Sequence, residues 1–342
     1  MVILLITNSK ELKKINIQTV KGVLKDNDYC TKNSLAKDTG LSVATCGNIL
    51  KELIFSGEVQ EVEKSDSTGG RPSRRFRFNK NFSYVSILFP RVEGNKTTVS
   101  INVLNLMGEI IYKDIKKENE ITPESLNVVF KEVISKYPKI KILSIGIPGV
   151  VKNGLISACD FKYLSNINLK DFFSAQYNIE TIVENDVNAC AAGYLKERLT
   201  NKIESFVYIY FPMSGIPGSG IIINNQIIRG KSNFAGEISY LPLLTERKFQ
   251  GEIQQNKDLF EKYISNIIQS INCIVNPQKI VLSGFCLSQQ IVNNVNFIME
   301  KKITKKNIPQ LIFEKDIEQS YFSGLKYLAF EKYFKNITII RK

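Results

Sequence analysis

The sequence contains no histidine among its 342 residues. This absence excludes Ser–His and Cys–His nucleophilic pairs and every metal site that needs an imidazole ligand. Acid–base chemistry would have to depend on carboxylates, lysines, tyrosines or cysteines. The six cysteines are widely spaced and form no C-x-x-C motif, so we expect reduced, buried thiols and no metal site.

Long hydrophobic runs are also missing. The opening MVILLITNSK is a short apolar run with no basic residue before it, and it fits neither a signal peptide nor a membrane span. We therefore expect a cytoplasmic protein that does not associate with membranes. The sequence has no short repeat and no low-complexity segment. With 43% hydrophobic and 23% charged residues, it is long enough for two or three domains with a sizeable core.

Residues 31–64 carry the spacing of a helix-turn-helix. Gly40 and Leu41 form the expected turn, and Ser42 is a suitable N-cap for the helix that follows. Apolar residues then recur at steps of three and four, as an amphipathic helix requires, and they are Val43, Cys46, Ile49, Leu50 and Leu53. The positions of this helix expected to contact DNA in a major groove are Ser42, Thr45, Gly47, Asn48 and Lys51.

The segment STGGRPSRRFRFN, residues 67–79, concentrates positive charge. Residues 64–80 have a net charge of +5 and residues 1–63 are neutral, while the whole chain carries +13. Strands at about 58–64 and 73–79 would form a wing around the glycines, and an arginine held there can enter a DNA minor groove. The alternative is a glycine-rich hinge with solvated charges. The expected wing contacts are Gly70, Arg71, Arg74 and Arg75.

From about residue 81, expected strands alternate with helices, which predicts an α/β domain with ligand-binding turns at strand ends. The turn ENDVN, residues 184–188, has an acid and two amides that suit a polyol, or it simply caps the next helix. The glycines of 214–221 could cradle a phosphate or form a tight turn. Glu237 follows a glycine turn and could add a second carboxylate, or could be an ordinary helix-start glutamate.

Taken in order, these segments resemble the ROK family of repressors, open reading frames and sugar kinases. The resemblance is carried by GGRP (69–72), SIGIPGVV (144–151), ENDVN (184–188), RGKSNFAGEISYLPL (229–243), VLSGF (281–285) and FSGLKYLAF (322–330). It implies a winged helix-turn-helix domain at 1–80 and a two-lobed, actin-like or hexokinase-like domain at 81–342. Lobe one would span about 81–184 plus the C-terminal helix, and lobe two about 185–318.

The resemblance also implies site residues. Asn185, Asp186 and Glu237 match positions that contact the sugar in the family, and Asp186 matches the catalytic base of its kinases. Gly149 matches a turn beside the sugar. These four residues are the expected ligand-binding set.

Two departures from the family pattern argue against catalysis. The segment ILFPRVEGNKTT (87–98) stands where the kinases have an acidic, glycine-rich phosphate loop. Tyr240 stands at a position where many members have a zinc-binding histidine, and residues 241–272 contain no cysteine. We therefore expect no catalytic residues, no cofactor and no zinc.

The sequence thus predicts a DNA-binding transcriptional regulator, acting as a repressor on a double-stranded operator and responding to a sugar or sugar derivative. It would act as a homodimer or a dimer of dimers. One alternative is an active ROK-type sugar kinase with a DNA-binding arm. The other is a regulator whose ROK-like domain binds no ligand and only oligomerises.

Overall fold

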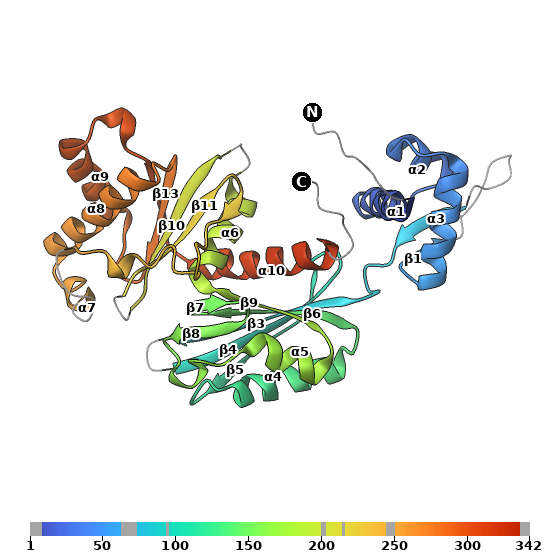
Figure 1. Cartoon of the computed structure of the whole chain (residues 1–342), viewed down its shortest axis with the longest axis horizontal. Helices are drawn as coiled ribbons and strands as arrows, with labels where there is room; N and C mark the ends of the chain where they lie inside the picture. Colours follow the sequence, from blue (N-terminus) through green and yellow to red (C-terminus); the bar gives the residue numbers. More distant parts are fainter. Residues whose placement is uncertain are drawn as a thin grey trace.

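The computed structural model describes residues 9–62, 74–93, 96–199, 203–213, 216–243 and 250–335. Its N-terminal part, which we call the head, has three helices followed by a two-stranded antiparallel sheet, the arrangement of a winged helix (Figure 1). The elements of the head are α1 (Ser9–Asp26), α2 (Lys32–Thr39), α3 (Val43–Ser56), β1 (Val59–Val62) and β2 (Arg75–Phe78).

The helices of the head begin and end at residues that suit their backbone positions. Thr31 caps α2 in a reciprocal capping box. Ser42 caps α3 as predicted, since its hydroxyl accepts the N–H of Thr45 at 3.0 Å. Gly40 and Gly57 end the two helices with φ of 71° and 84°, backbone angles that glycine adopts without strain. These local signals explain why the sequence predicted this region well.

The rest of the chain forms two lobes, each built on a five-stranded mixed sheet. Both sheets have the same topology: three antiparallel strands joined in sequence, followed by two parallel strands. The order is β5-β4-β3-β6-β9 in lobe one and β12-β11-β10-β13-β14 in lobe two. This repeated topology confirms the predicted α/β fold with two actin-like lobes.

The lobe-one sheet consists of β3 (Tyr84–Glu93), β4 (Lys96–Asn105), β5 (Ile110–Glu118), β6 (Ile140–Ile147) and β9 (Glu180–Asn185). Its helices are α4 (Pro123–Lys136) and α5 (Leu169–Tyr177), and a small hairpin is formed by β7 (Gly149–Lys152) and β8 (Leu155–Cys159). The lobe-two sheet consists of β10 (Ser205–Phe211), β11 (Gly218–Ile223), β12 (Gln226–Ile227), β13 (Lys279–Gly284) and β14 (Gln310–Glu314). The remaining helices are α6 (Asp186–Arg198), α7 (Gln250–Ile253), α8 (Lys257–Ile274), α9 (Gln289–Lys302) and α10 (Ile317–Lys335).

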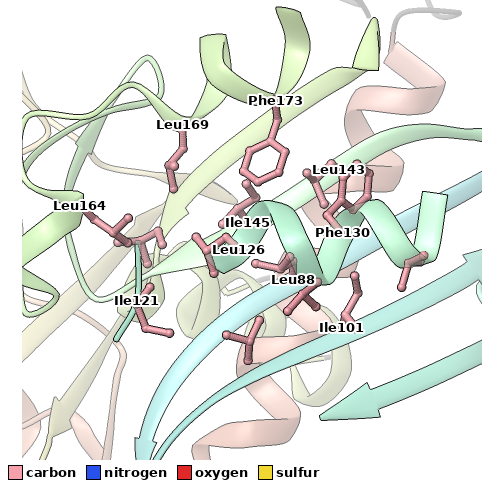
Figure 2. Close-up of a cluster of buried hydrophobic side chains, with 14 of the residues drawn as sticks. Leu88, Ile101, Ile121, Leu126, Phe130, Leu143, Ile145, Leu164, Leu169 and Phe173 are labelled. Carbon is pink, nitrogen blue, oxygen red and sulfur yellow. The ribbon is translucent and has the colours of Figure 1, made fainter. Parts of the chain in front are cut away.

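An apolar core joins the lobe-one sheet to α4 and α5. Figure 2 shows Phe130 of α4 close to Leu143 of β6, with Phe173 of α5 on the same side. The rings of Phe130 and Phe173 meet edge to face with centroids 5.7 Å apart, a favourable aromatic geometry. This core holds β6 and β9 in place, so the ends of these two strands are firmly positioned.

Helices α6 and α10 cross at a point where side chains would not fit. Gly324 of α10 lies against the backbone of Ala189, and Gly193 of α6 lies against the backbone of Ser320. A Cβ on either glycine would overlap with the opposite helix, so both positions depend on the absence of a side chain. The two helices therefore form one tightly packed unit between the lobes (Figure 1).

The other end of α10 reaches the head (Figure 1). The ammonium of Lys25 in α1 lies 3.8 Å from the ring centroid of Phe334, and the hydroxyl oxygen of Tyr333 lies 2.6 Å from that of Ser83, in the segment between the head and β3. Tyr333 also packs against the apolar core of the head. A single helix thus contacts both the lobes and the head. No helix within the described ranges is long and apolar enough to cross a membrane.

Candidate nucleic-acid interface and ligand site

The outer face of α3 presents polar side chains at most of the positions predicted to contact DNA. Ser42, Asn48 and Lys51 are exposed, and Thr45 is half-buried. The hydroxyls of Ser42 and Thr45 lie 2.8 Å apart, so the cap also orders this face. Together the face offers hydroxyl, amide and ammonium groups, which are the groups that proteins use on base edges and phosphates.

Two α3 positions differ from the prediction. Gly47, predicted to face outward, is buried because the side chain of Lys32 from α2 lies over it, with Cδ 3.8 Å from where a Cβ of Gly47 would be. Val43, predicted on the inner face, is 46% exposed because it is the first residue of α3 and precedes the turns that pack on the head core. Gly47 is therefore covered by the Lys32 side chain and is not part of the exposed face of α3.

The wing strand β2 separates its charges from its aromatic rings. Phe76 and Phe78 are buried in the head core, whereas Arg75 and Arg77 are exposed, because successive strand residues face opposite sides. Arg77 donates a hydrogen bond to the side-chain amide oxygen of Gln60 on β1. Two guanidinium groups thus stand on the solvent side of the wing.

Arg74, immediately before β2, forms an exposed ion pair with Glu61 at 3.1 Å. Exposed pairs of this kind contribute little stability, so the guanidinium can exchange the carboxylate for a DNA phosphate at small cost. Gly70 and Arg71, the other predicted wing contacts, lie outside the described residues.

In lobe one, Asn185 is held by three hydrogen bonds at the junction of β9 and α6. Its Oδ1 accepts the N–H of Asn188 at 2.8 Å, which makes it the N-cap of α6. Its Nδ2 donates to the carbonyl of Gly149 and to Asp186 Oδ1, both at 3.0 Å. Gly149 has no room for a side chain, since a Cβ would meet the backbone of Ala158 on β8. The structure therefore brings three of the four predicted ligand residues together, with Asn185 in a capping role.

Asp186 lies within electrostatic range of two other carboxylates, and we call the three residues the carboxylate cluster: Asp160, Asp186 and Glu237. Burial, followed by the nearby negative charges of Asp160 and Glu237, raises the pKa of Asp186 to about 7. One of its oxygens, Oδ1, accepts the N–H of Val187 at 2.9 Å. At neutral pH such a carboxyl is partly protonated and can donate or accept a hydrogen bond, as the hydroxyls of a sugar require.

Glu237 is positioned by a glycine turn that is anchored to β11. Gly236 has φ of 97°, and its carbonyl accepts both the N–H and the hydroxyl of Ser219 at 2.9 Å. A Cβ on Gly236 would overlap with the carbonyl of Ser219. Glu237 comes from lobe two whereas Asp160 comes from lobe one, so the cluster includes residues from both lobes.

An ion pair of a buried glutamate with a partly exposed arginine, beside the cluster, was not predicted from the sequence. Glu184 is 5% exposed and pairs with Arg229, which follows β12 in lobe two. The remaining Glu184 oxygen, Oε1, accepts hydrogen bonds from the backbone N–H of Asn185 at 3.1 Å and from the side chain of Asn188 at 3.3 Å. Glu184 therefore ties β9 to lobe two. The R-G-K at 229–231 was the only signal of this pair in the sequence.

The glycines of the 214–221 loop have a packing role where the structure describes them. Gly220 lies in β11, where a Cβ would come 2.7 Å from the carbonyl oxygen of Val187 and 2.8 Å from Cβ of Ala191 in α6. Gly218 likewise faces Val187. These two glycines let β11 pack closely against α6, and neither alternative predicted for the loop included this contact.

The segments that depart from the kinase pattern form ordinary structure. Residues 87–93 continue β3, and Arg91 in that strand pairs with Glu318 of α10 at 3.2 Å. Tyr240 is 55% exposed and its ring lies 5.0 Å from that of Phe234. Within the described ranges, no group of three or more histidine, cysteine, aspartate or glutamate side chains could hold a metal ion.

A surface groove of about 250 Å³ lies elsewhere, between β4, β5 and the start of α10. Two of its acids are already engaged, since Asp316 accepts the N–H of Glu318 at 2.8 Å and Glu318 pairs with Arg91. We therefore place the candidate ligand site at the carboxylate cluster on chemical grounds rather than at this groove.

Comparison with known proteins finds sequence similarity to one family and to several curated proteins. A sequence profile described as "ROK family" matches residues 92–253. The chain is 27% identical over 257 residues to a protein of Caldicellulosiruptor bescii named "Xylose repressor", covering 72% of this chain and 62% of that protein. It spans about three fifths of the length of the curated relatives it matches.

Solved structures show the same fold. One described as a ROK family transcriptional regulator, a homologue of the E. coli MLC protein, superposes with a TM-score of 0.63 at 16% identity, covering 94% of this chain and 100% of that one. A ROK hexokinase from Thermus thermophilus superposes with a TM-score of 0.61 at 14% identity, covering 74% and 99% of the two chains. Residues 92–253 therefore match the ROK family, and the chain shares the fold of these solved structures, with two actin-like lobes and a winged-helix head.

Proposed function

We propose that this chain is a sequence-specific DNA-binding repressor whose two-lobed domain binds a sugar or sugar derivative. The observation that carries the proposal is the head, in which α3 exposes a polar face and β2 exposes two arginines. The head corresponds to residues 1–80 and the ligand-binding domain to residues 81–342. Similarity to a protein named as a xylose repressor supports both parts.

The proposed effector site comprises Asn185, Asp186 and Glu237, with Gly149 beside it. Carboxylates and amides can satisfy neighbouring hydroxyls with charge-assisted hydrogen bonds. The protein would bind its operator as a homodimer or a dimer of dimers, with one head on each half of a two-fold site.

Operator selection from random DNA followed by fluorescence anisotropy tests the DNA-binding part. We expect a selected site to bind at least about a thousandfold more tightly than unrelated DNA at equal salt. Addition of D-xylose, and then of a panel of monosaccharides and sugar phosphates, tests the effector part. A protein that binds its operator but no member of the panel would instead be a regulator whose lobes only oligomerise.

A sugar kinase is the second candidate. A carboxyl with a pKa near 7 is suited to accept a proton from a sugar hydroxyl, which favours catalysis by Asp186. Phosphoryl transfer also requires groups that neutralise and position the phosphates and their metal ion. Strand β3 offers Arg91, already paired with Glu318, where the family's kinases have an acidic glycine loop. We therefore expect no sugar-dependent ATP turnover, and turnover that Asp186→Ala abolishes would contradict this.

A further inference from the structure

The head contains a basic groove that the contact positions predicted from the sequence do not account for. It has a volume of about 230 Å³ and is lined by Thr31, Lys32, Asn33 and Arg74. Two of these four residues are cations, and among the described residues no acidic side chain lines the groove. The groove lies between the start of α2 and the start of the wing strand β2.

The side chain of Lys32 reaches from this groove to α3, the helix proposed to enter the major groove. Its Cδ, Cε and Nζ atoms lie 3.8 to 3.9 Å from the position that a Cβ of Gly47 would occupy. Gly47 lies between Cys46 and Asn48 on α3, so the Lys32 stem rests on the helix beside an exposed side chain expected to meet DNA. Within the described part of the chain, Lys32 forms no ion pair with an acidic residue.

The second cation of the groove, Arg74, lies immediately before the wing strand β2. Its guanidinium is 72% exposed and its only described ion pair is the surface contact with Glu61. Two exposed cations that line one small groove fit one phosphate of a DNA backbone, because this anion attracts both and accepts several hydrogen bonds. The hydroxyl and amide groups of Thr31 and Asn33 can complete its hydrogen bonding.

We propose that Lys32 and Arg74 form a phosphate clamp that holds the DNA backbone beside the recognition helix, and that Gly47 is the seat on which Lys32 lies. This inference rests on the proposed DNA-binding function and adds a contact that fixes how α3 enters the major groove. It also explains why a small residue stands at position 47: the Lys32 stem lies over Gly47, where a Cβ would just touch it and a longer side chain would displace it.

Fluorescence anisotropy with a mixed-sequence duplex of about 30 base pairs tests the clamp, because phosphate contacts do not depend on base sequence. Each phosphate contact contributes about 0.9 to the slope of log K against log salt concentration. We expect Lys32→Gln to make the slope about 0.9 less steep and to reduce the affinity about fivefold to tenfold near 0.1 M salt. The double variant Lys32→Gln with Arg74→Gln should lower the slope by about 1.8.

Lys37→Gln is the matched control, because it removes the same charge from an exposed position at the other end of α2. We expect it to leave the salt slope of the full-length protein nearly unchanged. If Lys32→Gln and Lys37→Gln lower the slope equally, or neither does, the clamp is wrong while the DNA-binding function stands. If the wild-type protein shows no salt-dependent binding to duplex DNA, the proposed function and the clamp both fail.

Two substitutions at Gly47 test the seat. Gly47→Ala places a Cβ at ordinary contact distance from Lys32, so DNA affinity should stay within about twofold. Gly47→Leu would displace the lysine stem and should weaken binding about as much as Lys32→Gln does. Adding Gly47→Leu to Lys32→Gln should then cause little further loss, and full additivity would show that Gly47 acts independently of Lys32. Melting curves of each variant verify that the head remains folded.

Discussion

Replacing Asp186 with asparagine tests whether the carboxylate cluster destabilises the ligand-free protein. Asparagine retains the Oδ1 acceptor for the N–H of Val187 and removes one negative charge. The pKa of Asp186 is raised from 3.8 to about 7, so the folded protein holds this proton more tightly than the unfolded chain does. The resulting stability is fully present below about pH 4 and is lost as the pH rises through about 7.

The size of the effect follows from the two pKa values. The difference between 3.8 and about 7 sets an upper limit of about 4 kcal/mol, of which about 2–3 kcal/mol would be lost between pH 5 and 8. Solvent screening of a half-buried group reduces this, so we expect Asp186→Asn to gain about 1–2 kcal/mol more over wild type at pH 8 than at pH 5. Urea unfolding of both proteins at both pH values measures the difference.

The control for this experiment is Asp258→Asn, which makes the same chemical change at an exposed position in the first turn of α8. We expect its effect on stability to be the same at both pH values. If the gain from Asp186→Asn over wild type is also independent of pH, the pKa of Asp186 is not raised as described and the reasoning is refuted.

Three further substitutions probe the packing around the site, each measured by urea unfolding. Gly324→Leu places a side chain on the backbone of Ala189 and should cost at least about 3 kcal/mol, whereas Gly22→Ala, in open space on α1, should be tolerated. Arg229→Met leaves the Glu184 carboxylate buried without its cation and should cost about 2–4 kcal/mol, part of which a second change, Glu184→Gln, should restore. Tyr321→Phe removes a buried hydroxyl with no hydrogen-bond partner among the described residues, so a stability loss above about 1 kcal/mol would contradict the structure.

The parts of the fold that could be predicted are those set by local signals. The head followed from apolar spacing and from the caps Ser42 and Gly57. Helix α4 is likewise set by local signals, because Thr122 caps it and Pro123 begins it. In such segments the sequence and the tertiary contacts favour the same structure.

Elements with weak local signals were not predicted. Helix α9 has the sequence QQIVNNVNFIMEKK, in which Val292, Val295 and Met299 are the buried residues and asparagines obscure the period. Strands β8 and β14 have five residues each, too few for a clear alternation. These elements form because the lobes provide surfaces for them, and the sequence of each one alone does not reveal that.

The sequence indicated which residues belong to the site, but it did not indicate which contacts they make. The sequence indicated the polar residues of 184–188, yet it left open whether they cap a helix or bind a ligand. In the structure Asn185 is the N-cap of α6, and the carboxylate of Asp186 is left to interact with Asp160 and Glu237 of the cluster. Gly47 was misplaced because its burial depends on Lys32, which comes from another helix. Contacts between elements of this kind cannot be deduced from the periodicity of either helix.

Helix α10 provides the physical connection on which sugar-dependent regulation would depend. It packs against α6, which begins at Asp186, and its last turns contact the head through Tyr333 and Phe334. A ligand can shift this arrangement only if it binds one lobe arrangement more tightly than the other. Changing operator occupancy from about 90% to about 10% requires a differential affinity of about 80-fold, or about 2.6 kcal/mol. One hydrogen bond contributes about 0.5–1.5 kcal/mol, so a single contact is insufficient. An effector must therefore gain several contacts at once, and Asn185 at the end of β9 in lobe one together with Glu237 in lobe two would supply them from both sides.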